Sequence, residues 1–562
     1  MLRFSTDPLA NPFYYLDYLD YLLDFVACRY QKLLHPKEQE YLINFQYLPK
    51  DARALYARLL QRKGNYFRVD RLEYREIEDL DRAIEDLIAQ QFLSSIKGQR
   101  PDLDVRLRTK AELAKLGALE ALNLKKASRG EIDEAVLLKN YPLPFLPIIQ
   151  LERVGLFELC QYLFFGNRHQ NISEFITADL GIFRYETVDL ESAQAFDDRS
   201  LVDACRLVDH MRGWAALLDK ESRKLNRDPD TERTTALAAG LRTLTAMVPV
   251  PEDTRNSLLL RGLDKLHVAL GKVHERLGLI PEALSCYQHT ERAPARERCA
   301  RLLLKQNQYP EARVVCEQIL QHSVDPHERA YASRQLSGPK RTGEASETRR
   351  FTTERLILAL TEGPPVEQQV INYLSSQNQL AHHTENHLYP GLFGLFFWDI
   401  IFAPIAGAFH HPFTRQPADL FEPDFVRCRS DLFRLRFDEL SSSRFRAATL
   451  AQNWHAKKGL SNPFVAWHSL ELDTLEYVVD HTPWPALKAI FERLLSQLQT
   501  FRSGFPDLLC MTAEGYRLIE VKGPGDRLQS HQTAWLNFLA DLGIPTTVMH
   551  IEALIETSGK SG

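Results

Sequence analysis

Two acids and one lysine near the C-terminus have types and spacing that could support chemistry on a phosphate. Asp507 follows Pro506 at the start of the apolar stretch LLCM, and Glu520 and Lys522 belong to a second apolar stretch, YRLIEVK. A β-strand projects alternate residues to the same side, so the side chains of Glu520 and Lys522 point together. If the two stretches pair as a hairpin, Asp507 meets them at one end of the sheet.

A pocket with this composition suits a hard divalent cation. Carboxylate oxygens are ligands that Mg²⁺ and Mn²⁺ prefer, and such cations bridge phosphate oxygens while keeping several waters. A lysine beside them can position or help deprotonate an attacking water, or stabilise the charge that develops on phosphorus. The alternative interpretation is structural, because a lysine next to Glu520 or Asp507 can also form an ordinary surface ion pair.

The elements that must position these residues indicate an α/β domain. The two apolar stretches predict strands, the following GPGD predicts a turn, and SHQTAWLNFL predicts a helix that carries Gln532, Trp535 and Asn537. Further upstream, LFGLFFWDIIF predicts an almost wholly apolar, buried helix. Helices and strands are therefore mixed in residues 361–562, as in an α/β domain.

Length and composition indicate a multidomain globular protein. The chain has 562 residues, whereas single cores stop growing near roughly 250 to 300 residues. It has no run of about 18 apolar residues that could span a membrane and no signal-like N-terminal stretch, so we expect a cytoplasmic protein. The formal net charge of -5 excludes a globally basic surface, and contact with nucleic acid would need a local basic patch. Eight cysteines without a Cys-x-x-Cys pair argue against a zinc ribbon and a disulfide framework.

Residues 1–85 predict a helical region that ends in a basic, aromatic cluster. Apolar residues recur at three- and four-residue spacing in YYLDYLDYLLDFVACRYQKLL and in DARALYARLLQRK, as on the buried face of a helix. The side chains of the cluster could contact DNA phosphates, or they could belong to a solvated helix end with core aromatics. The cluster consists of Arg62, Lys63, Tyr66, Phe67, Arg68 and Arg71.

The middle of the chain predicts two further helical regions. Residues 86–145 contain two short helices joined by a turn, and they resemble either a degenerate SAP-type module or a plain helical linker. Residues 146–360 predict a helical scaffold. Its pattern is continuously helical from about 150 to 335, and near the end of that stretch is a repeat with a period of 29 residues, from Pro281 to Pro310, much like tetratricopeptide repeats. Stacked helical hairpins build a concave scaffold, which either binds protein partners or has a purely structural role.

Near the end of this region, one stretch predicts a linker and another predicts a single helix. SGPKRTGEASETRR, residues 337–350, has almost no apolar residue and predicts a loop or linker. RLILALTEG, which begins at Arg355, predicts one more helix before the α/β domain.

The run EVKGPGDRLQSHQTAWLNFL resembles the VRR-NUC branch of the PD-(D/E)xK nuclease superfamily, whose domains show a similar E-V-K-x-x-x-D-x-L-x-x-x-Q-x-x-W-L pattern. Together with RLLQRKGNYFRVDRLEYREI, the repeats and LFGLFFWDIIF, the resemblance covers nearly the whole chain and is to the Fanconi-associated nuclease family. It implies mostly α-helical N-terminal and TPR-like regions followed by a C-terminal α/β nuclease domain. It also implies a metal-dependent, structure-specific DNA endonuclease that cleaves 5′ flaps and branched DNA, with 5′-to-3′ exonuclease activity and a role in interstrand cross-link repair.

The resemblance implies roles for individual residues of the C-terminal domain. Asp507 and Glu520 are expected to be metal ligands and Lys522 the catalytic lysine. The backbone carbonyl of Val521 is a further expected ligand, and the metal would be Mg²⁺ or Mn²⁺. Bound to its DNA, a bacterial protein of this kind would be associated with the nucleoid.

A further glutamate is expected just before the apolar helix, and Glu385 in HHTENHLYPGLFGLFFWDIIF occupies that position. The sequence departs there from the family's usual Glu-Gly, because Asn386 follows Glu385. The alternative acid is Asp399, which lies inside the apolar helix and fits a structural role better. His383 and His387 raise a rival, since two histidines four apart on a helix could bind zinc with Glu385 between them, although no third ligand is evident.

The basic N-terminal cluster has two interpretations under this resemblance. In eukaryotic relatives an Arg-Lys pair in a similar stretch is thought to hold a 5′-terminal phosphate, which implies that role for Arg62 and Lys63. Tyr66 and Arg68 would contact the same DNA. The alternative is contact with the duplex backbone alone. For the whole protein, the alternatives to a flap nuclease are a four-way-junction resolvase and a non-catalytic DNA-binding scaffold.

Overall fold

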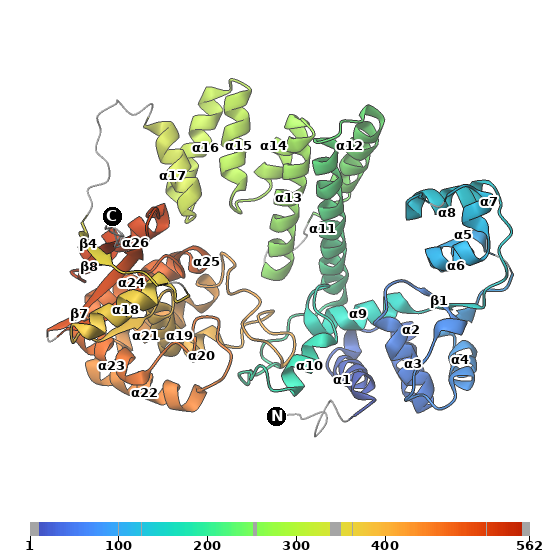
Figure 1. Cartoon of the computed structure of the whole chain (residues 1–562), viewed down its shortest axis with the longest axis horizontal. Helices are drawn as coiled ribbons and strands as arrows, with labels where there is room; N and C mark the ends of the chain where they lie inside the picture. Colours follow the sequence, from blue (N-terminus) through green and yellow to red (C-terminus); the bar gives the residue numbers. More distant parts are fainter. Residues whose placement is uncertain are drawn as a thin grey trace, which may run out of the picture. The chain divides into compact units, whose positions relative to one another are not determined.

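The chain folds into two compact units. Figure 1 labels the helices and strands of each. Unit 1 comprises Met1–Ile182 and Asp197–Arg199, and unit 2 comprises Phe183–Phe196 and Ser200–Gly562. Within the described residues, no helix is both long and apolar enough to cross a membrane. The computed structural model describes residues 11–98, 100–124, 126–250, 256–337, 350–361, 363–512 and 514–553.

Unit 1 opens with helices that pack around an aromatic core and with short strands that hold the basic cluster. Buried rings of Tyr41, Phe45, Tyr56 and Phe92 fill this core. The cluster does not end a helix as expected, because part of it forms a strand and a 3-10 turn. The elements are α1 (Tyr14–Arg29), η1 (Gln31–Leu33), α2 (Pro36–Tyr47), α3 (Lys50–Leu60), β1 (Tyr66–Arg68), η2 (Val69–Arg71), α4 (Leu80–Ala89) and β2 (Leu93–Ser95).

Three elements beyond residue 145 also belong to unit 1. They are β3 (Ile148–Leu151), α9 (Val154–Phe165) and α10 (Ser173–Asp179). The apolar strand β3 pairs antiparallel with both β1 and β2, giving a three-stranded sheet in the order β1-β3-β2. The helix α9 packs against α1. The segment just after residue 145 therefore completes the N-terminal fold and does not begin the helical scaffold.

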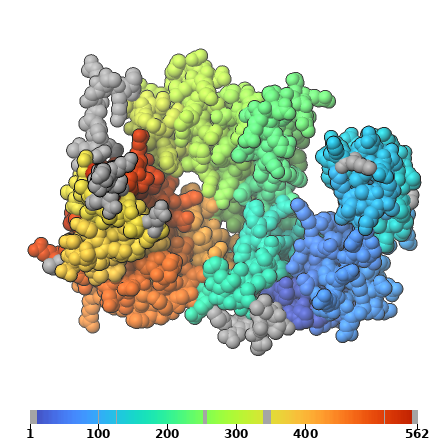
Figure 2. Space-filling model, in the orientation of Figure 1, coloured from blue at the N-terminus to red at the C-terminus, as the bar shows by residue number. Residues whose placement is uncertain are grey.

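Between β2 and β3 lies a small helical module with its own core. Leu113, Leu119, Ile132 and Val136 are buried at its centre, and the module is coloured light blue to cyan in Figure 2. Three helices form where two were expected after residue 107, because Gly117 adopts a left-handed φ of 77° that separates α6 from α7. The helices are α5 (Pro101–Arg106), α6 (Lys110–Lys115), α7 (Ala118–Ala121) and α8 (Arg129–Leu138).

The first part of unit 2 is a row of helices. The two copies of the sequence repeat form equivalent helices in it. The helices α14 and α16 begin at Ile280 and Tyr309, each with proline in its first turn. Consecutive helices from α13 to α17 pack against one another as hairpins. The helices are α11 (Arg199–Leu225), α12 (Thr231–Ala246), α13 (Ser257–Arg276), α14 (Ile280–Gln288), α15 (Ala295–Lys305), α16 (Tyr309–His322) and α17 (Pro326–Leu336).

The second part of unit 2 is an α/β domain built on a five-stranded mixed sheet. Its elements are β4 (Thr352–Leu358), α18 (Val366–Ser376), β5 (Ala381–His383), α19 (Leu388–Phe396), α20 (Trp398–Ile401), η3 (Arg427–Arg429), α21 (Ser430–Glu439), α22 (Ser443–Lys457), α23 (Leu472–His481), α24 (Trp484–Ser496), α25 (Leu498–Phe501), β6 (Leu508–Thr512), β7 (Gly515–Lys522), α26 (Ser530–Asp541) and β8 (Thr546–Ala553). The expected fold, helical regions followed by an α/β domain, is confirmed.

The sheet has the order β4-β8-β7-β6-β5, and its two faces belong to different cores. β6 and β7 form the predicted antiparallel hairpin, whereas β8 runs parallel to both β7 and β4. Ile519 and Val521 of β7 pack into one core with α18, and Leu518 packs into the larger core that contains residues of α19, α24 and α26. Because side chains alternate along a strand, Glu520 and Lys522 lie on the same side as Leu518.

The helix predicted for RLILALTEG is wrong, because this stretch contributes to the edge strand β4. β4 pairs in parallel with β8 from Thr352↔Thr547 to Leu358↔Ala553. The pairing, together with the β-branched residues Thr352 and Thr353, overrides the helical preference of the leucines. The sheet of the α/β domain therefore starts before residue 361. The predicted linker lies outside the described residues over positions 338–349.

Candidate active site

The β6–β7 hairpin brings Asp507, Glu520 and Lys522 to one end of the sheet. Oδ2 of Asp507 accepts a hydrogen bond from the backbone N–H of Val521 at 2.8 Å, and Nζ of Lys522 lies 2.7 Å from Oε1 of Glu520. The three residues are 7%, 0% and 8% exposed, respectively. Burial of this extent rules out the ordinary surface ion pair, since charges are kept in such a place only with compensating partners.

Burial and mutual repulsion raise the pKa of both acids, Asp507 and Glu520. Burial, and then the nearby charge of Glu385, raises the pKa of Asp507 to about 6 against the hydrogen bond from Val521. Burial, and then the charge of Asp507, raises the pKa of Glu520 to about 7 although Lys522 opposes this. When both acids are ionised, the site has more negative charge than its one lysine balances, which favours a bound cation or protons.

The same carboxylates fit a divalent cation. Oε2 of Glu520 is buried and has no hydrogen-bond partner among the described residues, and a buried oxygen of this kind calls for a ligand. Asp507 and Glu520 offer oxygen donors of the type that Mg²⁺ and Mn²⁺ prefer. Across the described part of the chain, no three His, Cys, Asp or Glu side chains are gathered closely enough to hold a metal ion as they stand.

Glu385 lies next to this pair of acids. The backbone N–H of Thr384 donates to the carbonyl of Asp507 at 2.9 Å, which places the residue after it beside the start of β6. The negative charge of Glu385 contributes to the raised pKa of both Asp507 and Glu520. Its carboxylate is half-exposed and accepts a hydrogen bond from Nδ2 of Asn386 at 2.9 Å.

Asp399 has a separate partner. It lies in the short helix α20 and forms a two-pronged ion pair with Arg436, with N···O distances of 2.7 and 2.9 Å. Its side chain is 65% exposed. Asp399 is thus a surface ion-pair residue, while Glu385 is the acid that lies near Asp507.

The helical zinc pair that HHTENH raised as a rival interpretation does not form. His383 ends β5 and His387 precedes α19, so the residues between them are not helical. The two imidazoles therefore lack the shared helix face on which the prediction rested. The ring of His387 instead lies 6.3 Å from that of His468, centroid to centroid.

The helix α26 supplies a partner to Glu520 that the sequence alone did not identify. Nε2 of Gln532 donates to Oε1 of Glu520 at 2.6 Å, while Oε1 of Gln532 accepts from the backbone N–H of Gln529. The indole of Trp535 stacks on Phe505 at 4.0 Å between ring centroids, just before the Pro-Asp turn. α26 therefore supports both the glutamate and the turn that carries Asp507.

The basic cluster of unit 1 borders a cavity of about 480 Å³. Arg62 lies there with Arg58, Arg71 and Tyr74, and its Nη1 donates to the hydroxyl of Tyr74 at 3.3 Å. Its guanidinium also stands over the ring of Phe67. Lys63 is exposed in the loop that follows α3, and Tyr66 begins β1.

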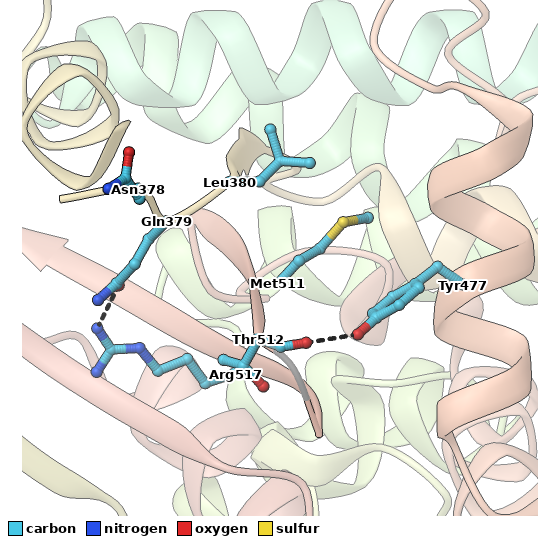
Figure 3. Close-up of a pocket in the computed structure, with 7 residues that line it drawn as sticks. All are labelled: Asn378, Gln379, Leu380, Tyr477, Met511, Thr512 and Arg517. Atoms are coloured by element: carbon cyan, nitrogen blue, oxygen red, sulfur yellow. Dashed lines mark hydrogen bonds between the residues drawn. The ribbon is translucent and has the colours of Figure 1, made fainter. Parts of the chain in front are cut away.

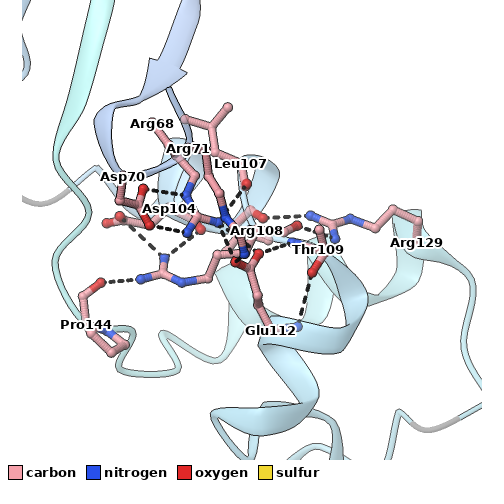
Figure 4. Close-up of polar contacts among 11 residues, drawn as sticks. Arg68, Asp70, Arg71, Asp104, Leu107, Arg108, Thr109, Glu112, Arg129 and Pro144 are labelled. Carbon is pink, nitrogen blue, oxygen red and sulfur yellow. Dashed lines mark hydrogen bonds and ion pairs between the residues drawn. The ribbon is translucent and has the colours of Figure 1, made fainter. Parts of the chain in front are cut away.

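Arg68 is held by acids and not free for a phosphate. Its guanidinium lies 2.7 Å from Asp70 and 2.8 Å from Glu112, and Arg71 reaches the same glutamate at 2.6 Å (Figure 4). The side chain of Arg68 is only 9% exposed. This geometry disfavours Arg68 as a DNA contact, because Glu112 ties it to the helical module that contains α6.

A second cavity lies at the far end of the hairpin from the acids. It measures about 640 Å³ and is lined by residues that include Gln379, Tyr477, Thr512 and Arg517 (Figure 3). The hydroxyl of Tyr477 donates to the carbonyl of Thr512 at 2.8 Å. None of the described residues that line this cavity carries a carboxylate, so they do not share the chemistry of the other end.

Comparison with known proteins gives matches at both ends of the chain. Residues 13–94 match the family model described as the FAN1 HTH domain, and residues 445–553 match the VRR-NUC domain model. The Fanconi-associated nuclease 1 homolog of Pseudomonas aeruginosa is 32% identical over 98% of this chain and 98% of its own length. The homolog of Arabidopsis thaliana is 25% identical, over 92% of this chain and 65% of its own length.

Solved structures agree over the full length. The crystal structure of paFAN1 bound to 2-nt 5′ flap DNA with a gap matches with a TM-score of 0.78 and 29% identity, covering 97% of this chain and 99% of that one. The complex with a 1-nt flap gives 0.76 and 30%. Fold and site together define a nuclease-class protein, with a helix-turn-helix region, a helical scaffold and a VRR-NUC domain. The chain belongs to the Fanconi-associated nuclease family.

Proposed function

We propose that this protein is a metal-dependent deoxyribonuclease that cleaves 5′ flaps and other branched DNA, with 5′-to-3′ exonuclease activity, in the repair of interstrand cross-links. The observation that carries the proposal is the buried meeting of Asp507, Glu520 and Lys522 at one end of the β6–β7 hairpin. The flap substrate is supported by the solved relatives, which hold 5′ flap DNA.

In this proposal the acids hold the cation and the lysine acts on the water and the phosphate. The ligands would be the carboxylates of Asp507, Glu520 and Glu385 and the backbone carbonyl of Val521. When bound, Mg²⁺ or Mn²⁺ would neutralise the scissile phosphate and lower the pKa of an attacking water. The ammonium group of Lys522, close to Glu520, would orient that water and stabilise the charge developing on phosphorus.

Contact with the DNA away from the cut is assigned to unit 1. Arg62 and Lys63 would hold either a 5′-terminal phosphate or the duplex backbone, and Tyr74 beside Arg62 offers a ring on which an unpaired base could stack. The helical repeats would position the DNA or a protein partner.

One experiment tests the proposal against its two alternatives. Flap, fork, nick and four-way-junction substrates, each labelled at the 5′ or the 3′ end, are incubated with Mg²⁺ or Mn²⁺. We expect cleavage of the 5′ flap and none without a divalent ion. Symmetric cuts in the junction by a protein whose mass in solution is that of a dimer would favour a resolvase. Binding without cleavage of any substrate would favour a scaffold.

A further inference from the structure

Asn386 has an unusual backbone conformation beside the candidate ligand Glu385. Its φ is +53°, in the left-handed region that non-glycine residues rarely adopt and that asparagine tolerates better than most. From this conformation its side chain makes two hydrogen bonds. Nδ2 donates to Oε1 of Glu385 at 2.9 Å, and Oδ1 accepts from the backbone N–H of Phe505 at 3.2 Å. One amide thus links the glutamate to the turn that leads into Asp507.

The three acids of the site share an arrangement. In each, one carboxylate oxygen accepts a hydrogen bond from an amide N–H of the protein, at 2.6 to 2.9 Å. An oxygen held in this way fixes the rotation of the carboxyl group and leaves the other oxygen for a ligand. The pairs of acid and donor are Asp507 with Val521, Glu520 with Gln532, and Glu385 with Asn386.

Glu385 needs such a donor more than the other two acids do. Asp507 and Glu520 are buried and confined by packing, whereas the carboxylate of Glu385 is half-exposed at the end of a flexible side chain. Fixing a long side chain of this kind costs conformational entropy unless a neighbour already restrains it. Nε2 of His383 lies 4.0 Å from Oε2 of Glu385, which is too long for a hydrogen bond.

We propose that Asn386 is a positioning residue that orients the Glu385 carboxylate for the cation and ties it to the turn carrying Asp507. The proposal rests on the proposed role of Glu385 as a metal ligand. The tie is firm because Phe505, whose N–H bonds to Asn386, is itself stacked on Trp535. A glycine at this position would adopt the same backbone without strain but would lose the amide.

The test measures the binding of Mn²⁺ to DNA-free protein by titration calorimetry, with the full chain. Asn386→Gly should weaken Mn²⁺ binding by about tenfold or more, the usual effect of removing a partner of a metal ligand. The matched control is Asn378→Gly. Asn378 also has a left-handed φ, +58°, but is exposed and away from the acids after α18. The control should bind Mn²⁺ as the unchanged protein does.

A double-mutant cycle separates positioning from a general loss of structure. If Asn386 acts through Glu385, then Asn386→Gly should cause no further loss of Mn²⁺ affinity in the Glu385→Gln background. Unchanged affinity in Asn386→Gly, or an equal extra loss in that background, would overturn the proposal. If the proposed metal site itself is wrong, Glu520→Gln should also bind Mn²⁺ with the affinity of the unchanged protein. This result distinguishes an error in the proposed function from an error in the role of Asn386.

Discussion

Lys522 and Gln532 donate to the same oxygen of Glu520, at 2.7 and 2.6 Å, the first from β7 and the second from α26. Oε1 is therefore saturated while Oε2, buried and without a hydrogen-bond partner in the described part of the chain, is the oxygen left for a ligand. Strand and helix together decide which side of this carboxylate a cation can reach.

Removing any member of the central set should stop cleavage without preventing DNA binding. Asp507→Ala, Glu520→Ala and Lys522→Ala should each lower the single-turnover cleavage rate by about 10² or more, as expected for preorganised charged groups at the scissile phosphate. Glu354→Gln is a matched control, since this acid lies on the edge strand β4 and pairs with Arg517. Full activity in the Glu520 variant would show that cleavage does not take place at this site.

Glu385 and Asp399 should respond in different ways to loss of charge. Glu385→Gln should raise the metal concentration needed for half-maximal cleavage. Asp399→Asn should leave that concentration unchanged and lower the free energy of unfolding by less than about 1 kcal/mol, since the Asp399 side chain is 65% exposed and Arg436 keeps Glu439 as a second partner. Metal titrations of the rate and urea unfolding check the two effects. A raised metal requirement in Asp399→Asn alone would move the ligand to α20.

The raised pKa values predict how the metal-free protein responds to pH. Asp507 and Glu520, with pKa values of about 6 and 7, bind more protons in the folded than in the unfolded chain between about pH 4 and 7. Their contribution to stability is therefore fully present at the acidic end of that range and is lost as pH rises through 7.

Thermal unfolding with a chelator present measures this effect. From pH 5.5 to pH 8, the Tm of the unchanged protein should fall a few degrees further than that of Asp507→Asn/Glu520→Gln, since each kilocalorie shifts Tm by roughly 2–4 °C in a domain of this size. Adding Mn²⁺ at pH 8 should raise the Tm of the unchanged protein again, and should raise that of the double variant much less. Parallel pH profiles for the two proteins would contradict the raised pKa values.

Residues of the basic cluster of unit 1 should differ in their roles. Arg62 and Lys63 should contact DNA, whereas Arg68 should have a structural role. If Arg62 and Lys63 hold a terminal phosphate, Arg62→Ala/Lys63→Ala should shift the cut sites and erase any preference for a 5′-phosphorylated end. If they contact the duplex backbone, binding to every substrate should weaken alike and the salt slope should fall by about one to two.

Arg68→Ala serves as the structural comparison within the same cluster. This arginine is occupied by Asp70 and Glu112, so its loss should lower Tm and leave the salt dependence of binding nearly unchanged. Arg82→Ala, an exposed arginine paired on its own helix, controls for charge alone. A reduced salt slope in Arg68→Ala would return that residue to the DNA contacts.

Local patterns in the sequence predicted the hairpin and the repeat, because alternation, turn residues and period are properties of neighbouring residues. They could not predict β4, whose partner strand is almost two hundred residues away. Likewise the partner of Arg68 is Glu112, and the partner of Asn386 is the backbone of Phe505. Contacts of this kind depend on tertiary packing, so the spacing of residues along the sequence does not predict them.

The strand order also bears on when the protein becomes able to cut DNA during its synthesis. β8 lies between β4 and β7 and joins them, so the sheet stays in two pieces until residues 546–553 have left the ribosome. Pairing across such a distance in the chain is slow to form. A nascent chain whose helix-turn-helix region and repeats have already emerged would thus still lack a complete sheet beside its cleavage centre. Translation itself would therefore delay DNA cleavage until the last strand has been made.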